Sequence, residues 1–317
     1  MEKPAVLCRR IVTALAVLAL TFAGAVAQPV VVHASPTSTV RPVDVHATEG
    51  ENQVFDPGLI ISDYNFYNSD AMTPGEIQRF LASRNCSPRD GSPCLTHYRQ
   101  DTMSQPAQGS GHCATYRGSR DERASRIIAR VADACGISPK VLLVLLQKEQ
   151  SLLTRPSASG YLRATGYGCP DTADCNAEYF GFFNQVYNAA WQFRQYTQEP
   201  ERAYRIGLVD IRFNPDAACG SSLVEIRNQA TANLYNYTPY QPNQAALAEQ
   251  KSSRDVCSAH GNLNFWTLYN RWFGSPTSTR YPMLFDDCLN LTGGQPCRPS
   301  ELIPSLQPTG PLRESTH

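Results

Sequence analysis

The sequence predicts a mainly α-helical protein of the α+β class, with a small disulfide-bonded module before the helices. Apolar residues recur at helical spacing over most of residues 119–274. Residues 55–118 are instead rich in turn-forming residues and cysteine, and the aliphatic stretch Arg205–Phe213 is typical of a short strand or hairpin. We therefore divide the chain into a signal peptide (1–27), a flexible leader (28–54), a small N-terminal module (55–118), a helical domain (119–274) and a Pro/Ser/Thr-rich C-terminal extension (275–317).

The first 27 residues have the three parts of a signal peptide. A basic start that includes Arg9 and Arg10 precedes an almost wholly apolar run, 11–26, and Ala25-Val26-Ala27 offers the small-x-small pattern that signal peptidase cuts. We expect a mature chain that begins near Gln28 and is secreted or cell-wall associated; an uncleaved N-terminal anchor is the alternative. No later segment approaches the ~20 apolar residues of a membrane span.

The cysteine count also predicts export. Of eleven cysteines, Cys8 lies in the segment that cleavage removes, and the remaining even set implies disulfides, which persist in oxidising compartments. Close spacing suggests the pairs Cys86/Cys94, Cys169/Cys175 and Cys288/Cys297, and Cys219/Cys257 could close a longer loop, although spacing does not determine connectivity. The candidates are Cys86, Cys94, Cys113, Cys135, Cys169, Cys175, Cys219, Cys257, Cys288 and Cys297.

Charge and metal-ligand spacing narrow the function classes. Signal cleavage removes three of 28 basic and one of 28 acidic residues, which leaves a net charge of −2. Because no basic run could track a polyanion, we do not expect a nucleic-acid partner. No CxxC doublet occurs, and His97, His112 and His260 lack metal-ligand spacing, so we expect neither a metal nor a cofactor.

The N-terminal module contains one clear helix start. Thr73 is the expected N-cap, Pro74 occupies the first helical position, and Glu76 completes a capping box. Ile77 and Leu81 give this helix an apolar face.

Two further helices are predicted together with their ends. Asp121–Cys135 carries an apolar stripe that Gly136 ends. Ser138 caps the next helix, which has proline in its first turn and runs to about Thr154. Its body, 141–146, is apolar nearly all round, as in a central buried helix.

Three amphipathic stretches complete the helical domain: Gln185–Tyr196, Ser222–Tyr235 and Asn262–Phe273. Ser222 and Glu225 form another expected capping box, and Gly274 ends the last helix.

Glu149 is the residue that breaks the local pattern. On a helix, its neighbours three, four, seven and eight positions away are Val141, Leu142, Leu145, Leu146, Leu152 and Leu153. A carboxylate there costs several kcal/mol unless it takes a proton or finds partners, and a carboxyl group that keeps its proton suits a general acid. The alternative is that the helix has reached the surface and Glu149 is solvated beside Lys148 and Gln150.

Three segments resemble motifs of one enzyme group, the lysozyme-like lytic transglycosylases and related muramidases. Gly136–Ser151 resembles their catalytic-helix region, where a glutamate ends a buried helix and serine follows closely. Gly181–Ala190 looks like their glycine-to-glutamine segment, which lines the sugar groove, and 232–240 is similar to a tyrosine-bearing segment that faces the glutamate. The segments follow in the family's order, but here Gln150 separates the glutamate from the serine.

The whole chain also looks like a group of exported actinobacterial proteins of undefined function that carry a lysozyme-like domain. It shares their segments Phe55–Ile61 and Met72–Leu81.

This resemblance implies a lysozyme-like fold and peptidoglycan or another cell-wall glycan as the ligand. Glu149 would donate a proton to the leaving glycosidic oxygen and then act as the base. Ser151, Gln185, Tyr235 and Tyr237 would bind the substrate or orient the acid. Helix capping and core packing are the alternative roles of Gln185 and Tyr237.

A muramidase or glucosaminidase would need a second carboxylate, for which Asp171, Asp174 and Glu178 are candidates, with turn formation as their alternative role. A lytic transglycosylase needs none, because the 6-hydroxyl of the substrate attacks and leaves a 1,6-anhydro end.

Two other function classes remain open. The same fold could serve a non-catalytic cell-wall or carbohydrate-binding protein, an adhesin or scaffold, whose behaviour would not depend on the Glu149 carboxylate. A thiol hydrolase would use a free cysteine with His260, and the even cysteine set argues against it.

Overall fold

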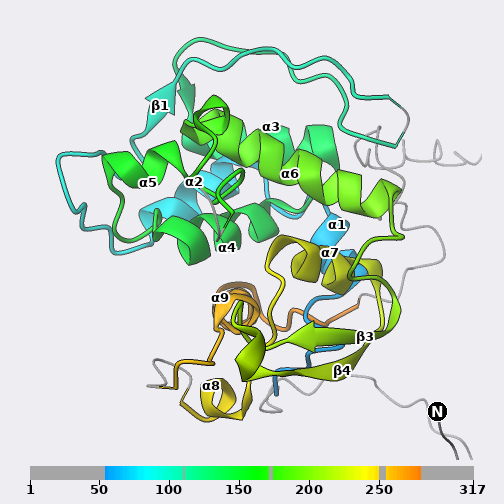
Figure 1. Ribbon diagram of the computed structural model, residues 1–317. Helices are drawn as coiled ribbons and strands as arrows, with labels where there is room; N and C mark the ends of the chain where they lie inside the picture. The colour runs from blue at the N-terminus through cyan, green and yellow to red at the C-terminus, as the bar shows by residue number, and fades with distance from the viewer. Residues whose placement is uncertain (1–53, 110, 171–173, 250–254, 280–317) are drawn as a thin grey trace, which may run out of the picture. The chain divides into compact units, whose positions relative to one another are not determined.

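The computed structural model describes residues 54–109, 111–170, 174–249 and 255–279 (Figure 1). The expected signal peptide, the leader up to residue 53, Asp171 and the suggested pair Cys288/Cys297 lie outside the described residues.

Most of the secondary structure is helical, which confirms the predicted class. The helices are α1 (Asp63–Tyr67), α2 (Pro74–Ala82), α3 (Ala124–Cys135), α4 (Pro139–Gln150), α5 (Ala158–Leu162), α6 (Phe182–Gln198), α7 (Gln229–Tyr237), α8 (Gln244–Glu249) and α9 (Gly261–Phe273). Two antiparallel pairs, β1 (Arg99–Gln100) with β2 (Glu122–Arg123) and β3 (Gly207–Arg212) with β4 (Ser221–Ile226), form small sheets. The single 3₁₀ turns η1 (Ala177–Tyr179) and η2 (Ala217–Cys219) lie between these elements.

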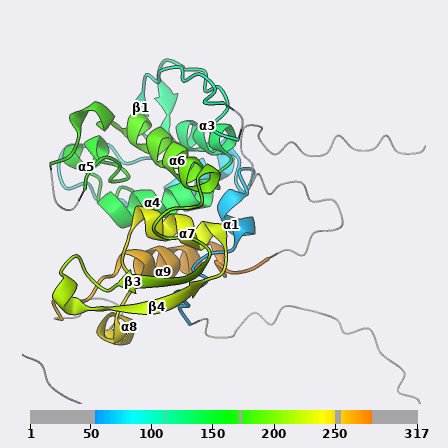
Figure 2. The same cartoon turned by 45° about the vertical axis from the view of Figure 1, so that its right-hand side comes forward.

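Helix α4 is the central helix that the sequence predicts. Its residues 141–146 are each at most 1% exposed, and it packs against α3 and α9. Both views show α6 on one side of α4, with α7, α9 and the β3–β4 hairpin on the other (Figures 1 and 2). Burial on opposite sides accounts for an apolar sequence without a polar face.

Helix α3 begins three residues later than predicted. Asp121 has a left-handed backbone (φ 48°), and Glu122–Arg123 pairs with Arg99–Gln100 instead of entering the helix. The buried Glu122 carboxylate accepts hydrogen bonds from the hydroxyls of Thr102 (2.6 Å) and Tyr116 (2.8 Å). Burial alone would raise the pKa of Glu122, but hydrogen bonds to the charged form lower it.

Helix α4 ends at Gln150, whereas the sequence predicts an end near Thr154. Ser151 adopts a left-handed conformation (φ 55°). The Gln147 side chain then holds the following turn: its oxygen accepts from the Leu153 amide (3.2 Å) and its nitrogen donates to the Thr154 hydroxyl (2.9 Å). The two leucines after Ser151 are buried, so they match the apolar stripe without continuing the helix.

The short strand or hairpin predicted at Arg205–Phe213 is present as the single strand β3. Its partner strand in the hairpin comes from a later segment, which the sequence predicts as a helix. Residues 221–226 form β4, in register with β3 from Gly207↔Ile226 to Arg212↔Ser221, and the predicted Ser222/Glu225 capping box does not form. Val224 and Ile226 are buried while the residues between and before them are exposed. This period of two is the pattern of a strand.

Helix α7 therefore starts only at Gln229. Asn228 caps it, because its side-chain oxygen accepts from the Thr231 amide (3.1 Å).

Other helix ends agree with the sequence. The Thr73/Glu76 capping box and the Pro74 start of α2 are confirmed. Gly136 ends α3 in a left-handed conformation (φ 62°), and Gly274 ends α9.

Four disulfides join cysteines of the described residues: Cys86–Cys94, Cys113–Cys135, Cys169–Cys175 and Cys219–Cys257. Three of them confirm pairs suggested by spacing, whereas spacing suggests no partner for Cys113 or Cys135. Because disulfides persist in oxidising compartments, these bonds point to an extracellular protein.

Residues of the predicted N-terminal module and of the helical domain share one hydrophobic core. The Phe66 ring lies 5.1 Å from that of Phe193, and the Phe66 carbonyl accepts from the Ser138 amide (2.8 Å). The first residues of the extension also contact α1, where Pro276 O accepts from the Ser62 amide (3.0 Å). Within the described ranges, no helix has the length and apolar character that a membrane span requires.

Candidate functional site

Glu149 lies in the last turn of α4, where the buried helix reaches a cleft. Its side chain is 24% exposed and forms an ion pair with Lys148, whose own side chain is 7% exposed. The Lys148 ammonium also donates to the Thr238 hydroxyl (3.0 Å). Glu149 is therefore neither a lone carboxyl group among leucines nor a freely solvated charge.

Two adjacent pockets, the first of which contains Glu149, share part of their lining, and we call them together the Glu149 groove. The first, about 540 Å³, contains Lys148, Glu149, Gln150, Thr165, Gly166, Cys169, Asn214, Pro215, Tyr237, Thr238, Pro239, Tyr240, Ser258, Ala259 and Gly261. The second, about 470 Å³, contains Gly166, Tyr167, Gly168, Cys169, Pro170, Tyr179, Gln192, Tyr196, Asn236, Tyr237 and Pro239. Four residues line both pockets and make them continuous.

The second pocket is lined by tyrosines and amides. Among the described residues, Lys148 and Glu149 are the only charged side chains of the groove. Tyrosine rings combine a large apolar face with a polar hydroxyl, and concave sites with a few polar groups are typical of small-ligand binding. The groove is therefore suited to a neutral, hydroxyl-rich ligand.

Disulfides close loops on both walls of the groove. Cys169–Cys175 closes the short loop that brings Cys169 and Pro170 to the groove. On the other wall, Cys219–Cys257 joins the loop after β3 to the segment before α9, and the Asn214 side chain donates to Val256 O (3.1 Å).

Gln185 is fully buried and faces the protein, not the groove. Its side-chain oxygen accepts from the amides of Thr165 (3.2 Å) and Tyr167 (3.1 Å). Its nitrogen donates to the carbonyls of Tyr167 and Tyr179 (2.8 Å each). Gln185 thus holds residues 165–167, which we call the Gly166 loop, beside Glu149. All the hydrogen-bonding groups of its side chain are used in this way, so Gln185 does not make the predicted direct contact with substrate.

Tyr237 lines both pockets of the groove. Its hydroxyl donates to Thr165 O (2.8 Å). Burial, and next the negative charge of Glu149, raise the pKa of the Tyr237 phenol well above its ordinary value. The phenol therefore keeps its proton and joins α7 to the Gly166 loop.

Ser151 and Tyr235 do not line the groove. Ser151 ends α4 through its left-handed backbone. Tyr235 is fully buried, and its hydroxyl donates to Pro57 O (3.0 Å). In the structure, both residues therefore stabilise the fold and do not contribute to the groove.

The second-carboxylate candidates lie away from the groove where the structure describes them. Asp174 and Glu178 are exposed and belong to neither pocket. Glu178 lies in η1, where its backbone amide donates to the side-chain oxygen of Asn176 (3.0 Å). This agrees with turn formation, the alternative role given above for Glu178. Asp171 lies outside the described residues.

Sequence reasoning missed Lys148, Gly166 and the tyrosines 167, 179 and 196. For Lys148 the signal is its adjacency to Glu149, although an adjacent pair of charges more often indicates exposure to solvent. For the tyrosines, the signal is the local abundance of tyrosine between 161 and 196.

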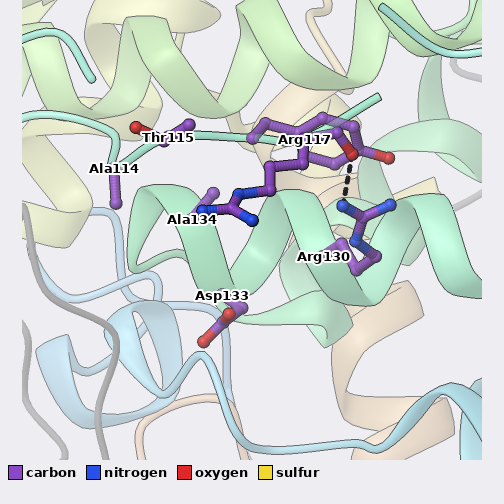
Figure 3. A pocket seen from close by; sticks show the side chains of 7 residues that line it. Ala114, Thr115, Arg117, Arg130, Asp133 and Ala134 are labelled. Carbon is purple, nitrogen blue, oxygen red and sulfur yellow. Dashed lines mark hydrogen bonds between the residues drawn. The ribbon is translucent and has the colours of Figure 1, made fainter. Parts of the chain in front are cut away.

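Within the described ranges, no group of three or more His, Cys, Asp or Glu residues is placed to hold a metal ion. A separate pocket of about 230 Å³ lies between residues 114–117 and α3 (Figure 3). Arg130 beside it already pairs with Glu122 (2.5 Å) and donates to the Arg117 carbonyl. Because no predicted site residue lines this pocket, we place the candidate site in the Glu149 groove.

Comparison with known proteins identifies the family. No curated protein and no solved structure matches the chain. The family described as "LasA, N-terminal domain" matches residues 59–284, which contain every helix from α1 to α9 and the described groove. This chain therefore belongs to the LasA N-terminal domain family.

Proposed function

We propose that this protein binds and cleaves peptidoglycan glycan strands outside the cell, with Glu149 as the general acid and base on a lysozyme-like fold. The observation that carries the proposal is the position of Glu149. Among the described residues it is the only carboxylate in the groove, and it extends from the end of a buried helix into the first pocket, which is continuous with the second.

The chemistry requires a proton for the leaving oxygen and a nucleophile for the sugar carbon. Glu149 delivers the proton and then accepts one from the attacking hydroxyl. Ordinary glycosidases add a second carboxylate, and the described groove residues supply none. Attack by the substrate's own 6-hydroxyl, the lytic transglycosylase route, needs no second carboxylate and therefore fits the described part of the groove better than hydrolysis does.

The groove lining supports a glycan as the ligand, and the family is compatible with a cell-wall target. LasA, from which the family takes its name, is a staphylolytic protease, so a wall target is compatible with the family. The tyrosines and amides around the second pocket offer ring faces and neutral hydrogen-bonding groups to sugar hydroxyls.

One observation favours a second function, wall binding without cleavage. The Glu149 carboxylate is already paired with Lys148, and an ion-paired carboxylate accepts hydrogen bonds but donates none. In an adhesin or scaffold the pair would serve only to hold the groove.

Digestion of purified peptidoglycan decides between the two functions. The mature chain is compared with Glu149→Gln and with Glu178→Gln, a matched change at an exposed carboxylate, and the products are resolved by mass spectrometry. Anhydro-muropeptides from the parent and from Glu178→Gln, but not from Glu149→Gln, are the expected result. If all three proteins sediment with the wall and none cuts it, cleavage is excluded and binding takes its place.

A further inference from the structure

The two oxygens of the Glu149 carboxylate have different surroundings. Oε1 accepts from the Lys148 ammonium. Oε2 faces Gly166, where a Cβ atom added to the glycine would be only 3.4 Å away, and it has no hydrogen-bond partner among the described residues. One oxygen is thus held by the protein, and the other is available to the groove.

The Lys148 side chain is itself held in place. Its ammonium donates to Thr238 Oγ1 (3.0 Å), and its side chain is only 7% exposed. Thr238 is fixed in turn by Asn262, whose side chain donates to the Thr238 carbonyl (2.9 Å). Lys148 consequently cannot swing into solvent without breaking its hydrogen bond to Thr238 at the end of α7.

The start of α9 leaves room for this arrangement. Gly261 lies so close to Thr238 that an added Cβ would be 2.5 Å from the Thr238 methyl group and 3.9 Å from Lys148 Cε. A side chain at position 261 would displace Thr238 and with it the anchor of Lys148.

We infer that Lys148 is a positioning residue for the proposed reaction: anchored on Thr238, it holds Oε1 of Glu149 and directs Oε2, the oxygen that carries the transferred proton when Glu149 acts as the acid, to the glycosidic oxygen beside Gly166. This inference rests on the proposed function, since it assigns the orientation of the same carboxylate. In this role Lys148 acts through Glu149. Reaction rates depend on such orientation, and a misplacement of about 1 Å lowers the rate by about a hundredfold.

Three variants test the inference on the full mature chain. Lys148→Met removes the ammonium, and we expect kcat on purified peptidoglycan to fall by about a hundredfold with little change in KM. Lys148→Arg keeps a cation within reach of Oε1 and should restore most of the activity. Thr238→Val keeps the shape and removes only the anchoring hydroxyl, and a loss of about tenfold is expected from one hydrogen bond to a charged group.

Crystal structures of the parent and of Lys148→Met give a measurement that does not depend on turnover. We expect the Glu149 carboxylate to leave its position beside Gly166 in the variant. If the carboxylate stays in place, or if Lys148→Arg is as inactive as Lys148→Met, the inference is wrong. If the parent cleaves no glycan, the proposed reaction fails, and the same pair of structures still shows whether Lys148 holds the carboxylate.

Discussion

Replacing Gln185 by leucine separates a structural role from a substrate-binding one. The Gln185 side chain is fully buried and makes four hydrogen bonds to the backbone of Thr165, Tyr167 and Tyr179, between 2.8 and 3.2 Å. Leucine has a similar volume but can make none of them, so two amides and two carbonyls lose their partner.

The expected loss follows from this count. A typical intramolecular hydrogen bond contributes about 1 kcal/mol net, and a buried group without a partner costs more. The free energy of unfolding of Gln185→Leu should therefore fall by about 4 kcal/mol. Wall binding should weaken as well, because the Gly166 loop borders both pockets.

Urea unfolding followed by fluorescence, together with sedimentation on insoluble peptidoglycan, measures both quantities. Gln192→Leu is the matched control, since Gln192 lies seven residues further along α6 and lines the second pocket without a side-chain hydrogen bond among the described residues. It should bind the wall less well with little change in stability. If Gln185→Leu unfolds at the same urea concentration as the parent and loses only wall binding, Gln185 is a substrate contact and our reasoning fails.

Two further predictions concern the groove wall and the response to acid. Replacing Cys219 and Cys257 by serine opens a loop of 38 residues, which should lower the free energy of unfolding by about 4 kcal/mol on the chain-entropy model and abolish wall binding. In the control variant, Cys86 and Cys94 are replaced by serine, and stability should fall while wall binding is kept. Equal wall binding by both variants would contradict the assignment of the Cys219–Cys257 loop to the groove wall. His112 is 9% exposed, its Nε2 bonds to Gln195 (2.8 Å), and burial lowers its pKa. Because its folded pKa lies below the unfolded value near 6.5, its contribution to stability is present above about pH 6.5 and is lost as the pH falls through the folded pKa. Stability measured between about pH 7 and 5 should therefore decline less steeply in His112→Gln than in the parent, and parallel curves would contradict this role.

The sequence by itself determined the local features of this protein. Caps such as Thr73 with Glu76, the left-handed Gly136 and the apolar body of α4 depend on residues within a few positions of one another, so their signals lie in the sequence. The position of Glu149 near the end of a buried helix belongs to the same class of signal.

Local patterns failed where a distant partner outweighed them. Residues 221–226 fit a capped helix by composition, yet β3 pairs with them and leaves every second side chain buried near the end of the strand. Residues 121–123 fit the start of α3, yet Arg99–Gln100 and the partners of the Glu122 carboxylate hold them outside it.

Only the tertiary structure decided how the candidate site is arranged. Thr238, the anchor of Lys148, is 90 positions away in the sequence, and the bonds of Gln185 reach back as far as 20 positions. Helical periodicity places Gln185 on a buried face but does not show what that face contacts. The sequence thus identified the carboxylate, while the fold determined that Lys148 holds it, that Gln185 supports its loop and that tyrosines border it, because those contacts exist only once distant segments pack together.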